Sequence, residues 1–237
     1  MSTAAFNDEA LKRGVASVRH PLTRALLALT FTTGFVDAVS YLSLGHVFTA
    51  NMTGNVVLLG FGLAGSGGLP VLAPTLSLVA FVLGATGGGR LVRRYEHPAL
   101  VSWALGIEVA LVAVSAVLAA TVTIRPGGVG ADTIILLLAL AMGVRAAAVR
   151  RMSVPDLSTV VLTMTLTALA SESTFAGGNG TGSVRRGSAV FAMGAGGLAG
   201  ALLLKIAAWV PLVVAALLAL VIRLIYVPAA VRRGANG

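Results

Sequence analysis

The sequence contains no cysteine, only three histidines and few charged residues. Without cysteine the chain can form no disulfide, no thiolate metal site and no cysteine nucleophile. The histidines do not cluster, and the sequence has neither an HExxH zinc motif nor a GxSxG nucleophile turn. We therefore expect no bound metal, no cofactor and no enzymatic activity.

The scarcity of charge sets the class of protein. Charged residues make up 11% of the 237-residue chain and hydrophobic residues 57%, with a mean hydropathy of +0.95. Apolar stretches long enough to span a bilayer recur along nearly the whole chain, which predicts an all-α integral membrane protein. We expect a single membrane domain over residues 1–237, with polar or small-residue tails at 1–19 and 228–237. No cleavage-like site precedes the first apolar run after Arg24, so we expect no signal peptide.

The few charges that remain are mostly positive, giving a net charge of +9. In a soluble protein this excess would suggest nucleic-acid binding, but in a membrane protein cytoplasmic arginines beside the spans explain it better. We therefore expect the lipid bilayer as the main partner and no nucleic acid.

Two of the apolar segments are short and polar. Each covers about 17 residues, or about 25 Å of helix, against a hydrocarbon core of about 30 Å. They are the second and sixth of the segments 22–44, 47–63, 71–89, 99–121, 133–149, 154–170, 188–204 and 207–227.

The positions of the arginines favour one topology over another. If every segment crossed, the arginines at 90–94 and the pair Arg150 and Arg151 would lie outside, against the positive-inside rule. If the two short segments instead enter and leave on one side, these arginines become cytoplasmic, and only Arg125 and Lys205 stay outside. This pattern predicts about six crossings plus two broken or re-entrant segments, with both termini cytoplasmic.

A weak internal repeat agrees with this topology. The run FVLGATGG at Phe81 returns as FAMGAGGL at Phe191, an offset of 110 residues, and GFVDA at Gly34 resembles GVRAA at Gly143. Two units of three crossings each must run in opposite directions, as in many channels and transporters. We predict two inverted repeats of about 110 residues, at 22–121 and 133–227, unless the match is a small-residue coincidence.

Two stretches resemble a known family. The runs GFVDAVSYLSLGHVFTANMTGNVVLLG and LAMGVRAAAVRRMSVPDLSTVVLTMTLTAL are similar to the YoaK-like DUF1275 family of bacterial membrane proteins. The resemblance implies about six transmembrane segments and a bacterial inner membrane, with no established activity. Family members often carry Gln-Asn after the second-half glycine, where this chain has Arg145 and Ala146.

The ANMTGN run and the aspartate before it are the strongest candidates for a site. Asp37 lies in the outer third of the first span, where a carboxylate can bind a cation, carry a proton or hydrogen-bond neighbouring backbone. Asn51, Thr53 and Asn55 alternate at the start of the short second segment, and Gly54 permits close backbone approach. At the tip of a broken helix they would bind a solute, or would only satisfy the interrupted backbone.

The second half offers hydroxyl groups. Thr159 and Thr163 are expected to face the first-half residues across the site, although threonines also bond back to their own helix.

Two further charges lie within spans. Glu108, with Asp37, is a proton-coupling candidate, because we place only these two carboxylates deep in spans. Arg145 can pair with Glu108, but we expect it to extend toward the cytoplasmic surface instead.

Glycines spaced four apart predict close helix packing. Gly84 with Gly88, and Gly196 with Gly200, fit the small-xxx-small pattern. We expect them to serve packing within the chain, with a homodimer as the alternative.

These features favour a transporter or channel for a small polar solute or ion, with proton coupling as the mechanism to test. The alternative is a membrane scaffold or regulatory protein that transports nothing, in which the buried polar groups serve folding alone.

Overall fold

The computed structural model describes residues 21–94, 97–151, 162–180 and 182–234, and within these ranges it contains helices and no strand. The prediction of an all-α chain is confirmed. The first-half helices are α2 (Pro21–Val39), the π-helix η1 (Ser40–Gly45), α3 (Met52–Leu63), the short 3-10 helix η2 (Ser66–Gly68), α4 (Leu72–Arg94) and α5 (His97–Thr121). The second-half helices are α6 (Val129–Arg151), α7 (Leu162–Ser171), the 3-10 helix η3 (Thr174–Ala176), α8 (Ser183–Leu204) and α9 (Trp209–Gly234).

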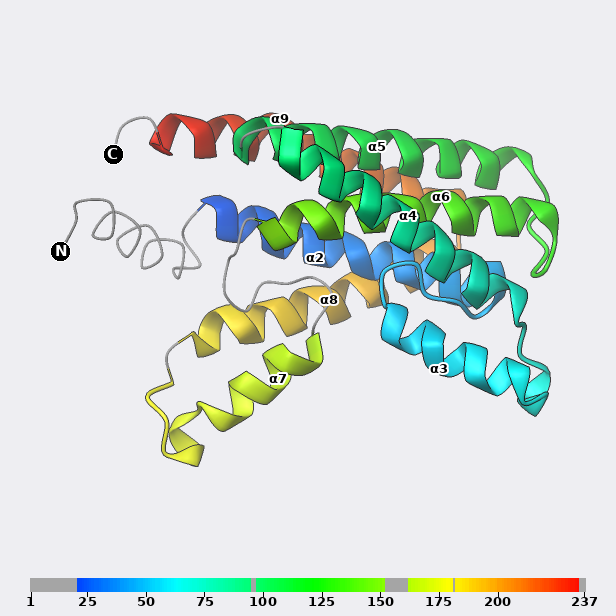
Figure 1. Cartoon of the computed structure of the whole chain (residues 1–237), viewed down its shortest axis with the longest axis horizontal. Helices are drawn as coiled ribbons and strands as arrows, with labels where there is room; N and C mark the ends of the chain where they lie inside the picture. Colours follow the sequence, from blue (N-terminus) through cyan, green and yellow to red (C-terminus); the bar gives the residue numbers. More distant parts are fainter. Residues whose placement is uncertain (1–20, 95–96, 152–161, 181, 235–237) are drawn as a thin grey trace.

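The long helices α2, α4, α5, α6, α8 and α9 run along the longest axis of the molecule (Figure 1). Helices α2, α5 and α8 run in one direction, and α4, α6 and α9 run in the other. Five candidate spans are long and apolar enough to cross a membrane: Thr23–Gly45, Leu72–Leu91, Ser102–Thr121, Val129–Arg150 and Ser183–Leu204. The chain is therefore a multi-pass helical protein of the membrane type. The described apolar part of α9, Trp209–Ile225, is shorter.

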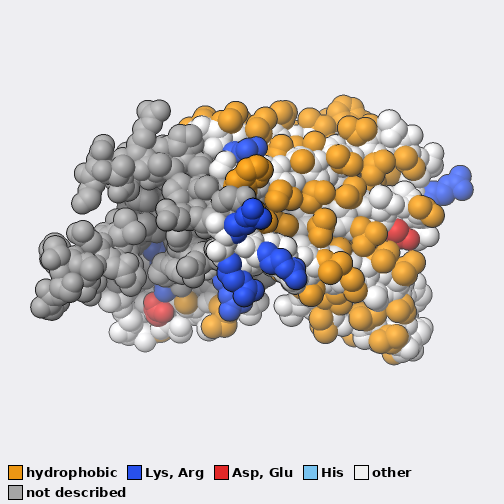
Figure 2. All heavy atoms as spheres, turned by 45° about the horizontal axis from the view of Figure 1, so that its top comes forward, with side chains coloured by type: hydrophobic (Ala, Val, Ile, Leu, Met, Phe, Trp, Pro, Cys, Tyr) orange, Lys and Arg blue, Asp and Glu red, His pale blue; other side chains and the backbone are white. Residues whose placement is uncertain are grey.

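The outer surface is apolar, as a lipid-facing surface must be. Large side chains on the outer faces of the long helices are exposed, including Val82 (60%), Val117 (62%) and Phe191 (76%). On the face shown in Figure 2, hydrophobic side chains are spread over the described surface, most of the Lys and Arg side chains in view form one band across it, and a further one projects at the right-hand end. Arg93 and Arg94 lie in the last turn of α4.

Helix α3 and the described part of α7 are each shorter than a bilayer-spanning helix. Their 12 and 10 residues cover about 18 Å and about 15 Å, against about 30 Å of hydrocarbon. Both lie on the same side of the bundle of long helices, extend outward from near the middle of its long axis and run toward opposite ends (Figure 1).

The long helices pack in matched pairs. The most extensive contacts join α4 to α6 and α2 to α8. Helix α5 packs on α9 and on α6, and α9 also packs on α2. Gly84 and Gly88 of α4 lie against the α6 backbone, and Gly196 and Gly200 of α8 lie against the α2 backbone. The expectation that these glycines serve packing within the chain is confirmed.

The apolar core lies where α2, η1, α5, α6 and α9 meet. Its fully buried members include Val36, Leu44, Ile135, Leu138 and Leu212. This core fixes the end of α2, and from that end the chain turns back toward the bundle centre.

Candidate functional site

Helix α2 ends in a backbone reversal. Its last turn widens into η1, and then Gly45 (φ 138°) and His46 (φ 56°) take backbone conformations that end the helix. His46 is the one non-glycine residue with positive φ in the described part of the chain. π-helical turns often lie at functional sites. Here the turn sends residues 47–51 back into the bundle as non-helical backbone.

Three side chains satisfy the polar backbone of this returning segment. Asp37 Oδ1 accepts hydrogen bonds from the Thr49 and Ala50 amides, at 3.1 and 3.0 Å. Asn55 Oδ1 accepts from the Phe48 amide at 2.9 Å, and Asn55 Nδ2 donates to the Phe48 carbonyl at 2.6 Å. The Ser77 hydroxyl donates to the same carbonyl at 2.7 Å. Non-helical backbone is tolerated at membrane depth only when it is satisfied in this way.

Asp37 has one oxygen left over. Its side chain is 6% exposed, and Oδ2 has no hydrogen-bond partner among the described residues. A buried carboxylate oxygen without a partner is costly, and such an atom calls for an explanation. Oδ1 of Asp37 therefore has the structural role that was one of the sequence alternatives, whereas Oδ2 is left without a partner.

The free oxygen belongs to a residue that lines a cavity of about 750 Å³. The cavity lies between α2, the returning segment and the first turns of α3 and α7, with α8 as a further wall. Its lining is Thr30, Thr33, Asp37, Tyr41, Phe48, Ala50, Asn51, Thr53, Gly54, Val57, Leu58, Leu162, Thr163, Thr165, Ala189 and Met193.

Most of the site residues chosen from the sequence meet in this cavity. Asp37 comes from α2, and Asn51, Thr53 and Gly54 come from the N-terminus of α3. Thr163 comes from the first turn of α7, so both halves of the chain contribute.

Asn55 has a different position. It is fully buried, does not line the cavity, and makes its hydrogen bonds to Phe48 and Ser77. Its contacts correspond to the backbone-satisfying alternative. Thr159 lies outside the described residues.

Three polar residues of the lining were not chosen from the sequence. Thr30, Thr33 and Tyr41 lie on the same helical stretch as Asp37. The spacing of residues 30, 33, 37 and 41 is three, four and four, which places them on one face of a helix. That spacing was the signal that could have found them.

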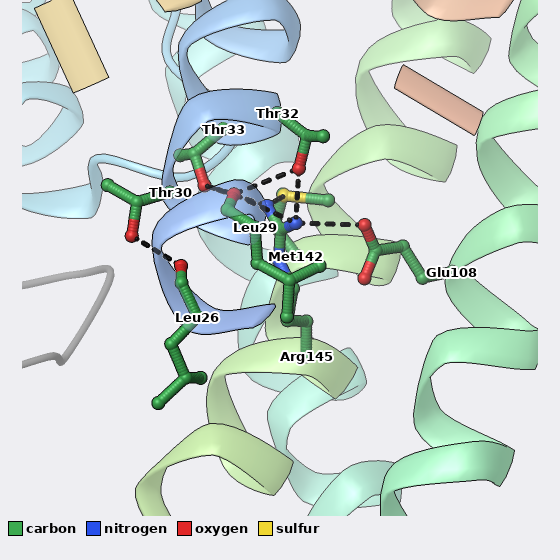
Figure 3. A network of polar contacts seen from close by, with 8 residues as sticks. All are labelled: Leu26, Leu29, Thr30, Thr32, Thr33, Glu108, Met142 and Arg145. Carbon is green, nitrogen blue, oxygen red and sulfur yellow. Dashed lines mark hydrogen bonds and ion pairs between the residues drawn. The ribbon is translucent and has the colours of Figure 1, made fainter. Parts of the chain in front are cut away.

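Arg145 and Glu108 form a buried ion pair beside the cavity wall (Figure 3). Their Nη1 and Oε1 atoms are 2.9 Å apart, and both side chains are 3% exposed. Arg145 also donates to the hydroxyls of Thr32 at 2.9 Å and Thr33 at 2.8 Å. The expectation that Arg145 extends toward the cytoplasmic surface is wrong. The facing carboxylate and two hydroxyls on α2 satisfy the guanidinium inside the bundle.

The charge of the cavity lining is carried by Asp37. Of the residues that the structure describes, no Lys, Arg or His lines the cavity, and the guanidinium of Arg145 is held by Glu108. Among the described residues, no group of three or more metal-ligating side chains gathers anywhere in the fold. What the cavity offers is one unpaired carboxylate oxygen, several hydroxyls and a helix N-terminus.

Comparisons with known proteins agree with the architecture. A family model described as "Protein of unknown function (DUF1275)" matches residues 25–225. The chain is 36% identical over 147 residues to the "UPF0700 transmembrane protein YoaK" of Bacillus subtilis (strain 168). That match covers 61% of this chain and 64% of the relative, so it spans less than two thirds of the relative's length. No solved structure matches the chain.

Proposed function

The chain belongs to the DUF1275 family, and because the family description names no activity, we propose a function from the geometry of the cavity. The protein is a transporter or channel that moves a small polar solute or ion across a bacterial inner membrane. Its site is the cavity between Asp37, the tip of α3 and the first turn of α7.

One observation carries this proposal: among the described residues, a buried carboxylate with an unpaired oxygen lines a cavity at the start of the short helix α3, opposite residues of α7. An ionisable side chain inside a membrane is rare unless it has a function. Transporter sites are commonly built where interrupted helices begin, near the middle of the bilayer.

An inverted repeat is the architecture that supports this function. The contacts of α4 with α6 mirror those of α8 with α2, and α3 on α4 mirrors α7 on α8. The glycines at the crossings correspond too. Gly34 and Gly143, which are 109 residues apart, and Gly84 and Gly196, which are 112 apart, each meet the backbone of the facing helix. These pairs support a repeat in which the number of residues between equivalent positions differs slightly from helix to helix, instead of being 110 throughout.

The arginines orient this architecture in the membrane. The α4 and α6 C-termini, the α8 N-terminus and the α9 C-terminus lie at one end of the bundle (Figure 1). Arginine pairs occur at or near each of these helix ends, whereas Arg125 and Lys205 lie in loops at the other end. The positive-inside rule supports a cytoplasmic position for this arginine-rich end, in line with our proposal that both termini are cytoplasmic.

We expect the loops after α3 and α7 to be accessible from opposite sides of the membrane. Because the chain has no cysteine, Ser66→Cys in η2 and Ser173→Cys after α7 each create a single thiol. A membrane-impermeant maleimide should label Ser66→Cys in intact cells, and Ser173→Cys only in inside-out vesicles. Labelling of both from the same side would contradict the inverted arrangement.

We expect Asp37→Asn to remove transport and to keep the fold. The amide oxygen of asparagine can still accept from Thr49 and Ala50, so only the unpaired carboxylate oxygen is replaced. Loss of a hydrogen bond to a charged group weakens solute binding by about ten- to a hundredfold. Flux into proteoliposomes measures this, for a labelled panel of inorganic ions, amino acids, sugars and organic acids, with and without a pH gradient.

The pH gradient tests the coupling mechanism in the same assay. Asp37 is the better proton carrier of the two candidates, because it lines the cavity whereas Glu108 does not and is paired with Arg145. A gradient should therefore stimulate wild-type flux and have no effect on Asp37→Asn. Thr86→Ala, on the exposed face of α4, is the control and should transport normally.

A scaffold without transport activity is the second candidate, because Asp37 Oδ1 and Asn55 both hold the returning segment in place. Under that function wild-type protein moves no member of the panel. Asp37→Asn would then lose neither stability nor partner binding, or would lose both together.

A further inference from the structure

We propose that the cavity binds a small zwitterion of the amino-acid class, with its ammonium group on Asp37 and its carboxylate on the first turn of α3. This inference names the substrate class of the cavity, so it rests on the proposed function.

The cation-binding end is formed by acceptors. Within the described part of the chain, Asp37 Oδ2 is buried and unpartnered, and no cationic side chain lines the cavity. The Thr30 hydroxyl, in the same lining, donates its hydrogen to the Leu26 carbonyl at 2.9 Å. The Thr33 hydroxyl donates to the Leu29 carbonyl at 2.9 Å and already accepts one hydrogen bond from Arg145, so it has one lone pair left. A hydroxyl whose hydrogen is engaged offers only lone pairs to a ligand. This part of the cavity therefore favours a group rich in donors, and a protonated amine supplies both donors and the missing positive charge.

The anion-binding end is the N-terminus of α3. The first amides of an α-helix, here those of Met52, Thr53 and Gly54, have no acceptor within the helix. The N-cap residue Asn51 makes no side-chain capping bond, and Thr53 and Gly54 line the cavity. Free amides and the helix dipole together favour a carboxylate or another anion.

The two ends are close in the chain and in space. The Thr49 and Ala50 amides hold Asp37 Oδ1, and these residues directly precede the N-cap of α3. The carboxylate of Asp37 thus lies beside the start of α3, where a single small molecule can meet both. A purely cationic ligand would leave the α3 amides without an acceptor, and a purely anionic ligand would face Asp37.

The rest of the lining suits an apolar side chain. Val57 and Leu58 on α3, Leu162 on α7, and Ala189 and Met193 on α8 contribute aliphatic surface to the same cavity. An amino acid with an aliphatic side chain, such as leucine, therefore matches all three parts of the lining.

The test compares L-leucine with two analogues that each lack one charged group. These are 3-methylbutylamine, which lacks the carboxylate, and 4-methylpentanoate, which lacks the amine. Binding to purified full-length protein in detergent is measured by calorimetry and by the rise in Tm that a ligand of the folded state must cause. Leucine should bind saturably, and each analogue at least about tenfold more weakly, because one charged contact is lost.

Two variants locate the binding. Asp37→Asn should weaken leucine binding by at least about tenfold while its Tm without ligand stays close to wild type. Thr86→Ala, which is away from the cavity, should bind leucine as wild type does. The proposal is overturned if no leucine binds, if leucine binding is unchanged in Asp37→Asn, or if either analogue binds as tightly as leucine.

Flux measurements separate this proposal from the one on which it rests. If 3-methylbutylamine or K⁺ binds in an Asp37-dependent way and crosses the proteoliposome membrane, the proposal of a zwitterionic ligand is wrong and the proposed transport function stands. If leucine binds at Asp37 and does not cross, the zwitterion site stands and the proposed transport function is wrong.

Discussion

Glu108→Ala is expected to be among the most destabilising single substitutions in this chain. It removes the carboxylate that lies 2.9 Å from Arg145 and leaves a guanidinium that is 3% exposed without its counter-charge. Breaking one partner of a buried ion pair costs about 3–5 kcal/mol. For a chain of this size the loss corresponds to a Tm about 6–20 °C lower. Thermal unfolding of the purified protein in detergent measures it directly.

The double variant Glu108→Leu with Arg145→Met is the control, and it should recover most of the lost stability. Replacing both members of a buried pair with apolar residues of similar size is often neutral or stabilising. The hydroxyls of Thr32 and Thr33 would stay satisfied, because each already donates to the Leu29 carbonyl at 2.9 Å. A double variant as unstable as Glu108→Ala alone would show that the pair does not account for the effect.

The pair also connects the cavity to the rest of the bundle. Thr33 lines the cavity and at the same time accepts from Arg145, which also pairs with Glu108 on α5. The position of the cavity wall on α2 therefore depends on helices α5 and α6, none of whose described side chains lines the cavity. Glu108 can affect solute binding through this connection without touching the solute.

The sequence predicted the helices well because membrane spans depend on local composition. The long segments found from hydropathy correspond to the long helices, and the two short polar segments contain α3 and α7. The predicted and observed helix boundaries differ where contacts with distant residues determine the backbone conformation. The segment that starts at residue 47 becomes helical only at Met52, because residues 47–51 are held as non-helical backbone by Asp37, Asn55 and Ser77.

The site was predicted only in part, because its hydrogen bonds join residues far apart in the chain. Asp37 and the ANMTGN run could be chosen by polarity alone, and they do line the cavity, with the exception of Met52 and Asn55. The different role of Asn55 depends on its contact with Ser77 of another helix, which no local pattern reports. In the same way, the pairing of Arg145 with Glu108 depends on how α6 and α5 are positioned relative to each other along the membrane normal. The hydropathy of a single segment does not report this position.

Substituting glycines at the helix crossings is the second change for which we expect a large effect. A Cβ atom at Gly196 would meet the backbone of Phe31, and one at Gly84 would meet the backbone of Leu140. The facing atoms are backbone, so the helices themselves would have to move apart. Overpacking of this kind costs about 1–3 kcal/mol. Gly196→Ala and Gly84→Ala should therefore lower the Tm by about 2–12 °C.

The chain supplies matched controls on the same two helices. A Cβ atom at Gly194 or at Gly87 would meet nothing within 4 Å. Because alanine is the better helix former, Gly194→Ala and Gly87→Ala should leave the Tm unchanged or raise it. Opposite signs at positions two or three residues apart cannot come from helix propensity, which is the same in both members of each pair. Equal effects in crossing and control variants would contradict the close packing of α8 on α2 and of α4 on α6. If the two crossing variants lose similar stability, then the two halves of the chain rely on the same contact, as an inverted repeat requires.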